Sequence, residues 1–207
     1  MKTMRTFSRV CIAAAVAVSA TSCGDVVRSS RASSILVVDS LTATRGTANT
    51  GTATSTLSSD VLTLVTSGGT CSSTSPCPTI FGDTGTLTLS QSAKDISIPL
   101  TSNNQITITR IHVSYRRTDG RNQEGVDVPF GFDTAATVTV PITGTAIASF
   151  VLVRNQAKSE PPLIQLVTNG QLISAIADVT AFGNDIVGNA VSASASIGVT
   201  FGNFGDQ

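Results

Sequence analysis

The feature that most constrains the fold is an unbroken alternation near the C-terminus. Apolar residues occupy every odd position from Val191 to Phe201, and small or polar residues occupy the even positions between them. Successive side chains of a β-strand point to opposite faces, so the pattern predicts a strand with one buried and one wet face. At about 3.3 Å per residue such a strand spans roughly 36 Å, enough to cross a β-sandwich from end to end.

Shorter segments of similar character precede it, each bounded by turn residues. The predicted strands are residues 60–66, 84–90, 96–100, 105–117, 137–142, 146–153, 163–167 and 178–185. Segment 146–153 is apolar on both faces, so we expect it to lie centrally in a sheet. Pro99 favours an edge or a strand end for 96–100, and Pro161-Pro162 favours an extended entry into 163–167.

The strand predicted at 105–117 changes parity. Its apolar residues sit at Ile106 and Ile108 and then at Ile111, Val113 and Tyr115. A regular strand cannot bury both sets on one face, because a slip of one residue turns every side chain over. We therefore predict a bulge or bend near residues 109–110, where a long strand can also pass from one sheet to the other.

Two stretches before residue 60 have weaker patterns. Ile35, Val38 and Leu41 recur at three-residue spacing behind serines, which predicts a short helix over 33–41, although the β-branched content also permits a strand. Residues 42–59 are nearly all Thr, Ala, Gly and Ser without a hydrophobic period. They are predicted to form a loop or linker.

Composition agrees with β-structure. The chain has 30 Thr, 26 Ser and 41% hydrophobic residues, but only 13% charged residues. It lacks the basic excess of a nucleic-acid-binding protein and the Ala, Leu, Glu and Lys richness of a helical bundle, and it is too apolar for a disordered chain. The sequence thus predicts an all-β fold, an antiparallel β-sandwich of about eight strands, with a closed barrel as the alternative.

The C-terminal quarter carries a family resemblance. The run Asp178–Asp185 contains Phe182-Gly183, the turn 186–189 ends in Gly188-Asn189, and the long alternating strand follows. These residues resemble the last two strands of bacterial immunoglobulin-like domains, which implies an immunoglobulin-like sandwich over residues 35–207 and names no activity. The whole chain also resembles uncharacterised bacterial lipoproteins that carry this domain.

The first 22 residues have the character of an export signal. A basic start with Lys2, Arg5 and Arg9 precedes an apolar run from Val10 to Ala20 and then Cys23. The segment resembles a bacterial lipoprotein signal, which implies acylation of Cys23 and a lipidated tether over 23–34; Gly24 after the cysteine is compatible with sorting to the outer membrane. Cleavage after Ala20, giving a free secreted protein, is the alternative. Without residues 1–22 the formal net charge becomes −3.

The resemblance to a lipoprotein signal implies that Cys11 leaves with the signal and that Cys23 carries the lipid, so two cysteines remain for the folded part. Cys71 and Cys77 are separated by five residues. In an oxidising compartment this spacing predicts a disulfide. A redox pair would have two intervening residues, and a zinc site would need further Cys or His ligands, of which the folded part offers only His112.

Charge is concentrated between Arg110 and Asp133, around a turn sequence at 118–125. Aromatic and basic side chains adjoin the turn, so the segment is a candidate surface for a protein or glycan partner. The candidate residues are Tyr115, Arg116, Arg117, Arg121, Phe130 and Phe132. The alternative is a hairpin whose charges only keep a sheet edge soluble.

Catalytic and metal-binding patterns are weak. The sequence has no nucleophile-elbow, zinc-protease or phosphate-loop motif, and His112 is its one histidine. Asp119, Glu124 and Asp127 are acidic residues of the kind that glycosidases use, but they lie on a predicted hairpin loop and imply no deep cleft. Acidic and amide residues around Asp185 leave a calcium site open, although turn chemistry accounts for them. We expect no cofactor, no metal and no catalytic residue.

These observations predict a cell-envelope lipoprotein, facing the surface or the periplasm, that acts as a non-enzymatic interaction or structural module. A carbohydrate-binding module is the alternative, and an enzyme comes third. The expected partners are the membrane, through the lipid on Cys23, and an envelope protein or glycan; nucleic acid is not expected. The expected location is the outer membrane, or outside the cell if Cys23 is not lipidated.

Overall fold

The computed structural model describes residues 31–48 and 51–205. The predicted signal and Cys23 lie outside the described residues, as does most of the tether. The described chain is 54% strand and 9% helix, so the all-β prediction is confirmed. No helix in these two ranges is both long and apolar enough to cross a membrane.

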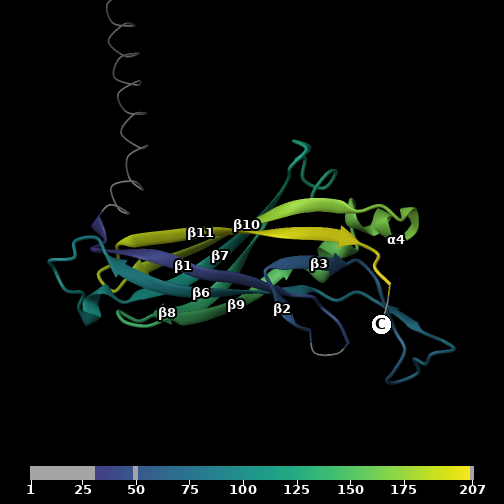
Figure 1. Cartoon of the computed structure of the whole chain (residues 1–207), viewed down its shortest axis with the longest axis horizontal. Coiled ribbons are helices and arrows are strands. Elements are labelled where there is room, and N and C mark those ends of the chain that lie inside the picture. Colours follow the sequence, from purple (N-terminus) through teal and green to yellow (C-terminus); the bar gives the residue numbers. More distant parts are fainter. Residues whose placement is uncertain (1–30, 49–50, 206–207) are drawn as a thin grey trace, which may run out of the picture.

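Two curved sheets pack face to face (Figure 1). One has the order β2 (Ala53–Thr54), β1 (Ser34–Thr44), β6 (Asp83–Ala93), β9 (Ala146–Val153); the other has the order β3 (Thr56–Asp60), β11 (Ala190–Gly202), β10 (Ile173–Asp185), β7 (Ile106–Arg117), β8 (Phe132–Val140). A small third sheet joins β4 (Thr63–Val65) to β5 (Cys77–Thr79). Neighbouring strands are antiparallel except β3 and β11, which run parallel, so the second sheet is mixed rather than purely antiparallel.

The alternation of the last strand is confirmed in β11. Val191, Ile197, Val199 and Phe201 are buried, whereas the serines between them face solvent. The neighbouring β10 buries a row of smaller side chains, and β1 of the opposite sheet packs across β11. The core therefore lies between the inner faces of the two sheets, as binary patterning requires.

The predicted bulge is present in β7. The pairing of β7 with β8 shifts register between Ile108 and Arg110. As a result Ile106, Ile108, Ile111 and Val113 are all buried despite their change of parity. The bulge keeps both apolar sets on the core side of one sheet; β7 does not cross to the other sheet.

The helix predicted at 33–41 is wrong. This segment lies in β1, which pairs antiparallel with β6 along its length. The segment forms a strand despite the three-residue spacing of its apolar residues, because its β-branched residues favour a strand and β6 supplies the backbone hydrogen-bond partners. The loop predicted at 42–59 is also too long: β1 continues to Thr44, and the stretch contains β2 and β3. Segment 96–100 forms no strand, and 60–66 contributes only the end of β3 and the short β4.

Two further predictions need correction. Segment 146–153 is a strand, but it lies at the edge of its sheet rather than centrally, and Ile147 and Val151 are exposed. Segment 163–167 is helical: η2 (Leu163–Gln165) runs into α4 (Leu166–Asn169), which ends at Gly170 with a left-handed φ of 63°. Leu163 and Leu166 are buried at three-residue spacing, the period of a helical turn rather than of a strand.

Candidate functional site

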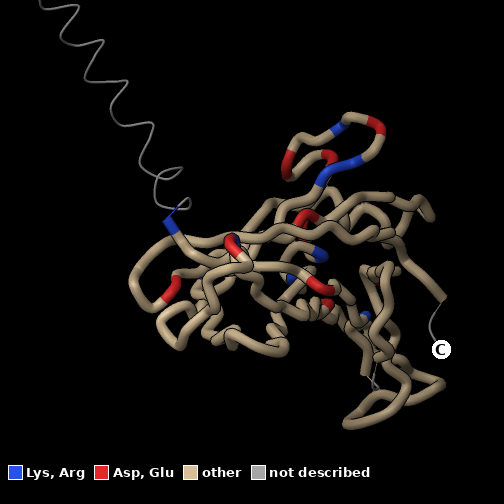
Figure 2. The backbone as a smooth tube through the Cα atoms, turned by 60° about the vertical axis from the view of Figure 1, so that its left-hand side comes forward, with Lys and Arg blue, Asp and Glu red and all other residues tan. Residues whose placement is uncertain are grey.

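The charged hairpin lies between β7 and β8, over residues 118–131 (Figure 2). Its turn is ordered by backbone hydrogen bonds, because the carbonyl of Gln123 accepts from the amides of Val126, Asp127 and Val128. The Val128 side chain is fully buried and anchors the hairpin to the sandwich. The hairpin therefore presents its charges in a defined arrangement.

Arg117, Asp119 and Arg121 form one ion-pair group on this hairpin. The Asp119 carboxylate lies 2.7 Å from Nη2 of Arg117 and 2.8 Å from Nη2 of Arg121. The hydrogen bond from Arg121, with a further one from Arg117, lowers the pKa of Asp119 to about 2. One carboxylate thus serves two guanidinium groups, and the group keeps a net positive charge.

These arginines line a cavity of about 450 Å³ between the hairpin and the helical segment after β9. The polar lining residues are Arg117, Arg121, Asp127, Gln165, Asn169 and Gln171, and the apolar ones are Val126, Pro162, Leu166, Leu172 and Ile173. Binding sites for small groups on proteins are concave and carry a few polar side chains that fix orientation. The cavity is therefore a candidate binding site.

Two of the three candidate arginines lie at this site. Arg117 and Arg121 line the cavity itself. Arg116 points from the outer face of β7, where its Nε donates to Asp178 at 2.6 Å. Neighbouring strand residues point to opposite faces, which explains why Arg116 is separated from Arg117.

The three aromatic candidates differ in their exposure to solvent. Phe130 is 49% exposed at the base of the hairpin. Phe132 is half-buried, and the Arg154 guanidinium lies over its ring at 4.4 Å. Tyr115 is in the core, where its hydroxyl donates to the carbonyl of Leu152 at 2.5 Å and its ring meets that of Phe201 edge-on. Tyr115 is therefore not available to a partner.

The amide side chains of the cavity were missed from the sequence. Gln165 falls in the segment predicted as a strand, and Asn169 and Gln171 follow it; that prediction gave no reason to expect all three at one cavity with the arginines of the hairpin. The Asn169-Gly170 pair is the signal that could have indicated the helix, because a left-handed glycine commonly ends one.

The acidic residues of the hairpin have structural contacts. Besides the Asp119 pairs, Glu124 accepts a hydrogen bond from the amide of Gly131 at 3.0 Å, and Asp127 accepts one from the amide of Gln123 at 3.2 Å. His112 belongs to a surface group, with Nδ1 3.0 Å from Asp133 and Arg110 at 2.7 Å from the same oxygen. These contacts order the hairpin and the outer face of the sheet.

The acidic and amide residues at the end of β10 form a closed turn. Asp185 accepts hydrogen bonds from the backbone amide of Asn189 at 2.7 Å and from its side-chain amide at 2.8 Å. Within residues 31–48 and 51–205, no group of three or more His, Cys, Asp or Glu side chains could hold a metal ion.

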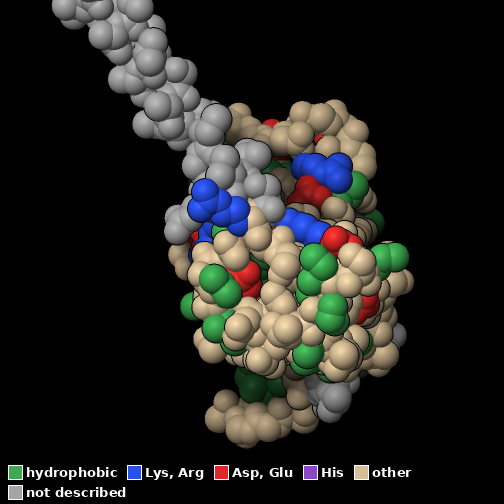
Figure 3. Space-filling model, turned by 90° about the vertical axis from the view of Figure 1, so that its left-hand side faces the viewer, with side chains coloured by type: hydrophobic (Ala, Val, Ile, Leu, Met, Phe, Trp, Pro, Cys, Tyr) green, Lys and Arg blue, Asp and Glu red, His purple; other side chains and the backbone are tan. Residues whose placement is uncertain are grey.

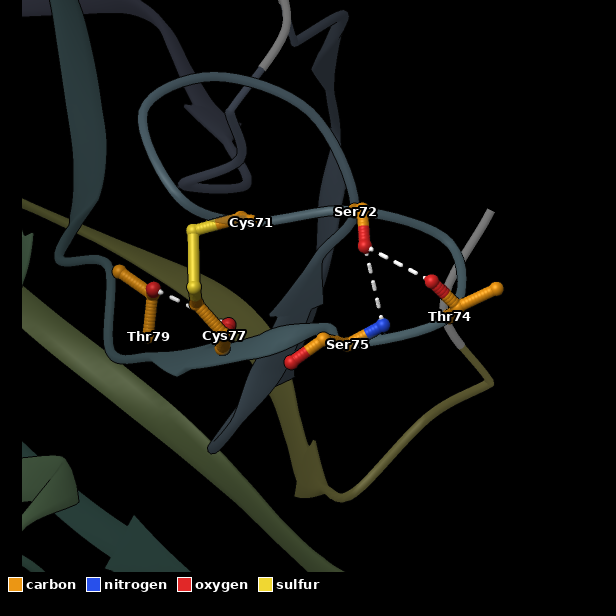
Figure 4. The surroundings of a disulfide bond; sticks show 6 residues. All are labelled: Cys71, Ser72, Thr74, Ser75, Cys77 and Thr79. Carbon is orange, nitrogen blue, oxygen red and sulfur yellow. Dashed lines mark hydrogen bonds between the residues drawn. A yellow bond between two sulfur atoms is a disulfide. The ribbon is translucent and has the colours of Figure 1, made fainter.

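The predicted disulfide is confirmed between Cys71 and Cys77 (Figure 4). Cys77 begins β5, and the bond closes a loop that also contains the turn from Ser72 to Ser75, where the Ser72 hydroxyl accepts from the Ser75 amide at 3.1 Å. The bond lies in an extension formed by β4, β5 and the loop between them, and not in the main sandwich.

Comparison with known protein families, with curated proteins and with solved structures finds no match for this chain.

Proposed function

We propose that the protein is a membrane-anchored envelope lipoprotein that binds a partner, without catalysis, at the cavity between hairpin 118–131 and the segment 162–173. The observation that carries this proposal is the cavity itself, where two arginines and three side-chain amides converge. An ordered hairpin with mixed polar donors suits recognition of another molecule.

The position of the cavity supports the same role. Arg31, where the described chain begins, lies near the first residues of β1, whereas the cavity lies by the first residues of β10. Strand β10 runs the length of the sandwich between these ends, and its 13 residues span roughly 40 Å. A lipid on Cys23 would leave the cavity facing away from the anchor.

The chemistry of the cavity favours a partner with carboxylate or hydroxyl groups. Asp119 uses the Nε and Nη2 groups of both arginines, which leaves further N–H donors on each guanidinium. Arginine forks bind carboxylates in two-point contacts, and side-chain amides both donate and accept.

A photo-crosslinker at Val126, on the cavity rim, tests the site in cells. We expect it to capture a specific envelope protein or glycan, and the substitution Arg121→Ala to reduce that capture severalfold. A crosslinker at Thr137, exposed on β8, is the matched control. Capture of the same molecule from Thr137 but not from Val126 would show that the site is assigned to the wrong face.

The anchor has its own test, because the N-terminus of the mature chain distinguishes the two forms. Mass spectrometry of protein purified from membranes should show a diacylated or triacylated Cys23. An unmodified chain beginning at Thr21 would instead establish a secreted protein.

A carbohydrate-binding module is the second candidate. It is favoured by the side-chain amides and the Asp127 carboxylate in the cavity, which are groups that bind sugar hydroxyls. No aromatic ring is among the lining residues, which counts against a stacking platform. Binding on a glycan array that Gln165→Ala and Asn169→Ala abolish would select this function, and an array without any binding would remove it.

We also propose that the sandwich is immunoglobulin-like. Strands β7, β10 and β11 adjoin one another as the C, F and G strands of that fold do, and β6 pairs with β9 as B pairs with E. The order of the strands supports the resemblance read from the C-terminal residues. An experimental structure in which β6 and β9 were not neighbours would overturn the assignment.

A further inference from the structure

Several large hydrophobic side chains are exposed at the end of the sandwich opposite the cavity. Ile96 is 97% exposed, Ile98 61%, Ile186 60% and Val187 70%. We call these four residues the apolar tip. Ile35 and Ile147, at the starts of β1 and β9, are also exposed nearby.

The strand pairing explains why these residues share one end. The loop with Ile96 and Ile98 follows β6, whose last residue Ala93 pairs with Ser34 at the start of β1. The turn with Ile186 and Val187 joins β10 to β11 and lies next to the start of β7. Figure 3 looks at this end directly and shows hydrophobic side chains distributed across it.

Charge is sparse at this end. Residues 94–105 contain Lys94 and Asp95 as their charged residues, the turns 141–145 and 186–189 contain none, and Arg31, where the described chain begins, adds one positive charge. The Asp95 carboxylate accepts hydrogen bonds from the amide and the hydroxyl of Ser97, at 2.9 and 2.6 Å. Hairpin 118–131, by contrast, carries Asp119, Arg121, Glu124 and Asp127. Exposed apolar surface with few charges is a feature of protein–protein and membrane interaction sites.

The position at which the described chain begins indicates that the apolar tip contacts a membrane. Arg31, the first described residue, lies at this same end, and Cys23 is eight residues earlier in the sequence. Eight fully extended residues reach at most about 29 Å, so an acylated Cys23 keeps the bilayer surface within that distance of Arg31, at the end of the sandwich that carries the apolar tip. Interfacial contacts of this kind bury apolar side chains at the boundary of headgroups and acyl chains.

We propose that the apolar tip inserts into the surface of the membrane that holds the lipid on Cys23. The sandwich then stands upright on the bilayer with the cavity at its far end, instead of moving freely on a flexible tether. This placement rests on the anchoring proposed above.

The experiment uses the full acylated chain reconstituted in vesicles of phosphatidylethanolamine and phosphatidylglycerol. A cysteine introduced as Val187→Cys carries an environment-sensitive fluorophore, since Cys71 and Cys77 are joined. Leu172→Cys is the matched control, because Leu172 is 57% exposed and lies by the cavity. We expect lipids brominated on their acyl chains to quench the label at position 187 severalfold more than at position 172.

A second set of variants tests the tip directly. The double substitution Ile96→Ser and Ile98→Ser should reduce the quenching at position 187, whereas Val126→Ser should not. Equal quenching at positions 187 and 172 would overturn the placement. The placement would also be overturned if, without vesicles, the emission of the label at position 187 shifted with protein concentration. A second copy of the chain would then cover the tip. An unacylated Cys23 in the mass spectrum would overturn the proposed anchoring. An acylated chain whose label at position 187 is not quenched would overturn only the placement of the tip in the membrane.

Discussion

Nζ of Lys158 lies 2.9 Å from Oδ2 of Asp83, and neither side chain is exposed to solvent. Asp83 also accepts hydrogen bonds from the Ser59 hydroxyl at 2.6 Å and from the Gly46 amide at 2.8 Å. Burial lowers the pKa of Lys158, and the charge of Asp83 acts in the opposite direction. The pair joins the start of β6 to α3 (Asn155–Lys158), which follows β9.

Removing the lysine should be costly, because it leaves a buried carboxylate without its counter-charge. We expect Lys158→Met to lower the free energy of unfolding by about 3–5 kcal/mol, measured by urea denaturation. Arg116→Met removes an exposed ion pair with Asp178 and should cost less than about 1 kcal/mol. The double variant Asp83→Asn with Lys158→Met should be more stable than Lys158→Met alone; equal stability would refute the charge argument.

Gly183 should be intolerant of a side chain. A Cβ there would lie 2.5 Å from the carbonyl oxygen of Thr107, a backbone atom of the neighbouring strand. We expect Gly183→Ala to destabilise the protein by about 1–3 kcal/mol in thermal or urea unfolding.

Gly198→Ala is the matched control for Gly183→Ala, since its nearest neighbour is the Thr56 methyl at 3.8 Å. It should change stability by less than about 1 kcal/mol, and a loss as large as that of Gly183→Ala would contradict the steric explanation.

The ion-pair group of the cavity should persist into acid. The pKa of Asp119 is lowered to about 2 by Arg121 and Arg117, below the ordinary value of the unfolded chain. The interaction is therefore fully present above about pH 4 and is lost as pH falls toward 2. Carbon-13 NMR of the carboxyl should show a midpoint near pH 2, and Arg121→Ala should move it upward. An unchanged midpoint in that variant would mean that Arg121 is not the partner in solution.

The disulfide should stabilise its own extension. Closing so short a loop contributes about 2 kcal/mol in the chain-entropy model. We expect Cys71→Ser with Cys77→Ser to speed hydrogen exchange at 63–79 while the amides of β10 and β11 keep their protection. Loss of protection in β10 as well would show that the extension and the sandwich unfold as one unit.

Much of the fold is predictable from local patterns. The alternation at 191–201 and the parity change at 105–117 both appear in the structure, as a strand and as a strand with a bulge. Both are properties of side-chain direction along one strand, so neighbouring residues carry the information. The Cys71–Cys77 disulfide is predictable for a similar reason, because the two residues are close in sequence.

The errors arise where a distant partner decides the outcome. The spacing of Ile35, Val38 and Leu41 suits a helix, but pairing with β6 makes the segment a strand. Segment 146–153 has the composition of a central strand, and only the order of the sheet places it at an edge. Tyr115 is a different case: its parity with Ile111 and Val113 already placed it on the core face, and only the partner is tertiary, the Leu152 carbonyl that accepts a hydrogen bond from its hydroxyl.

By itself the sequence determined that the chain forms strands, where the last strand runs, where the strand at 105–117 bends, and where charge gathers. The tertiary structure alone decided that Lys158 meets Asp83, that the amides of 165–171 face Arg117 and Arg121, and that the exposed apolar residues share one end. The physical reason is that strand geometry repeats every two residues, whereas a cavity or a buried ion pair depends on which distant segments the sheets bring side by side.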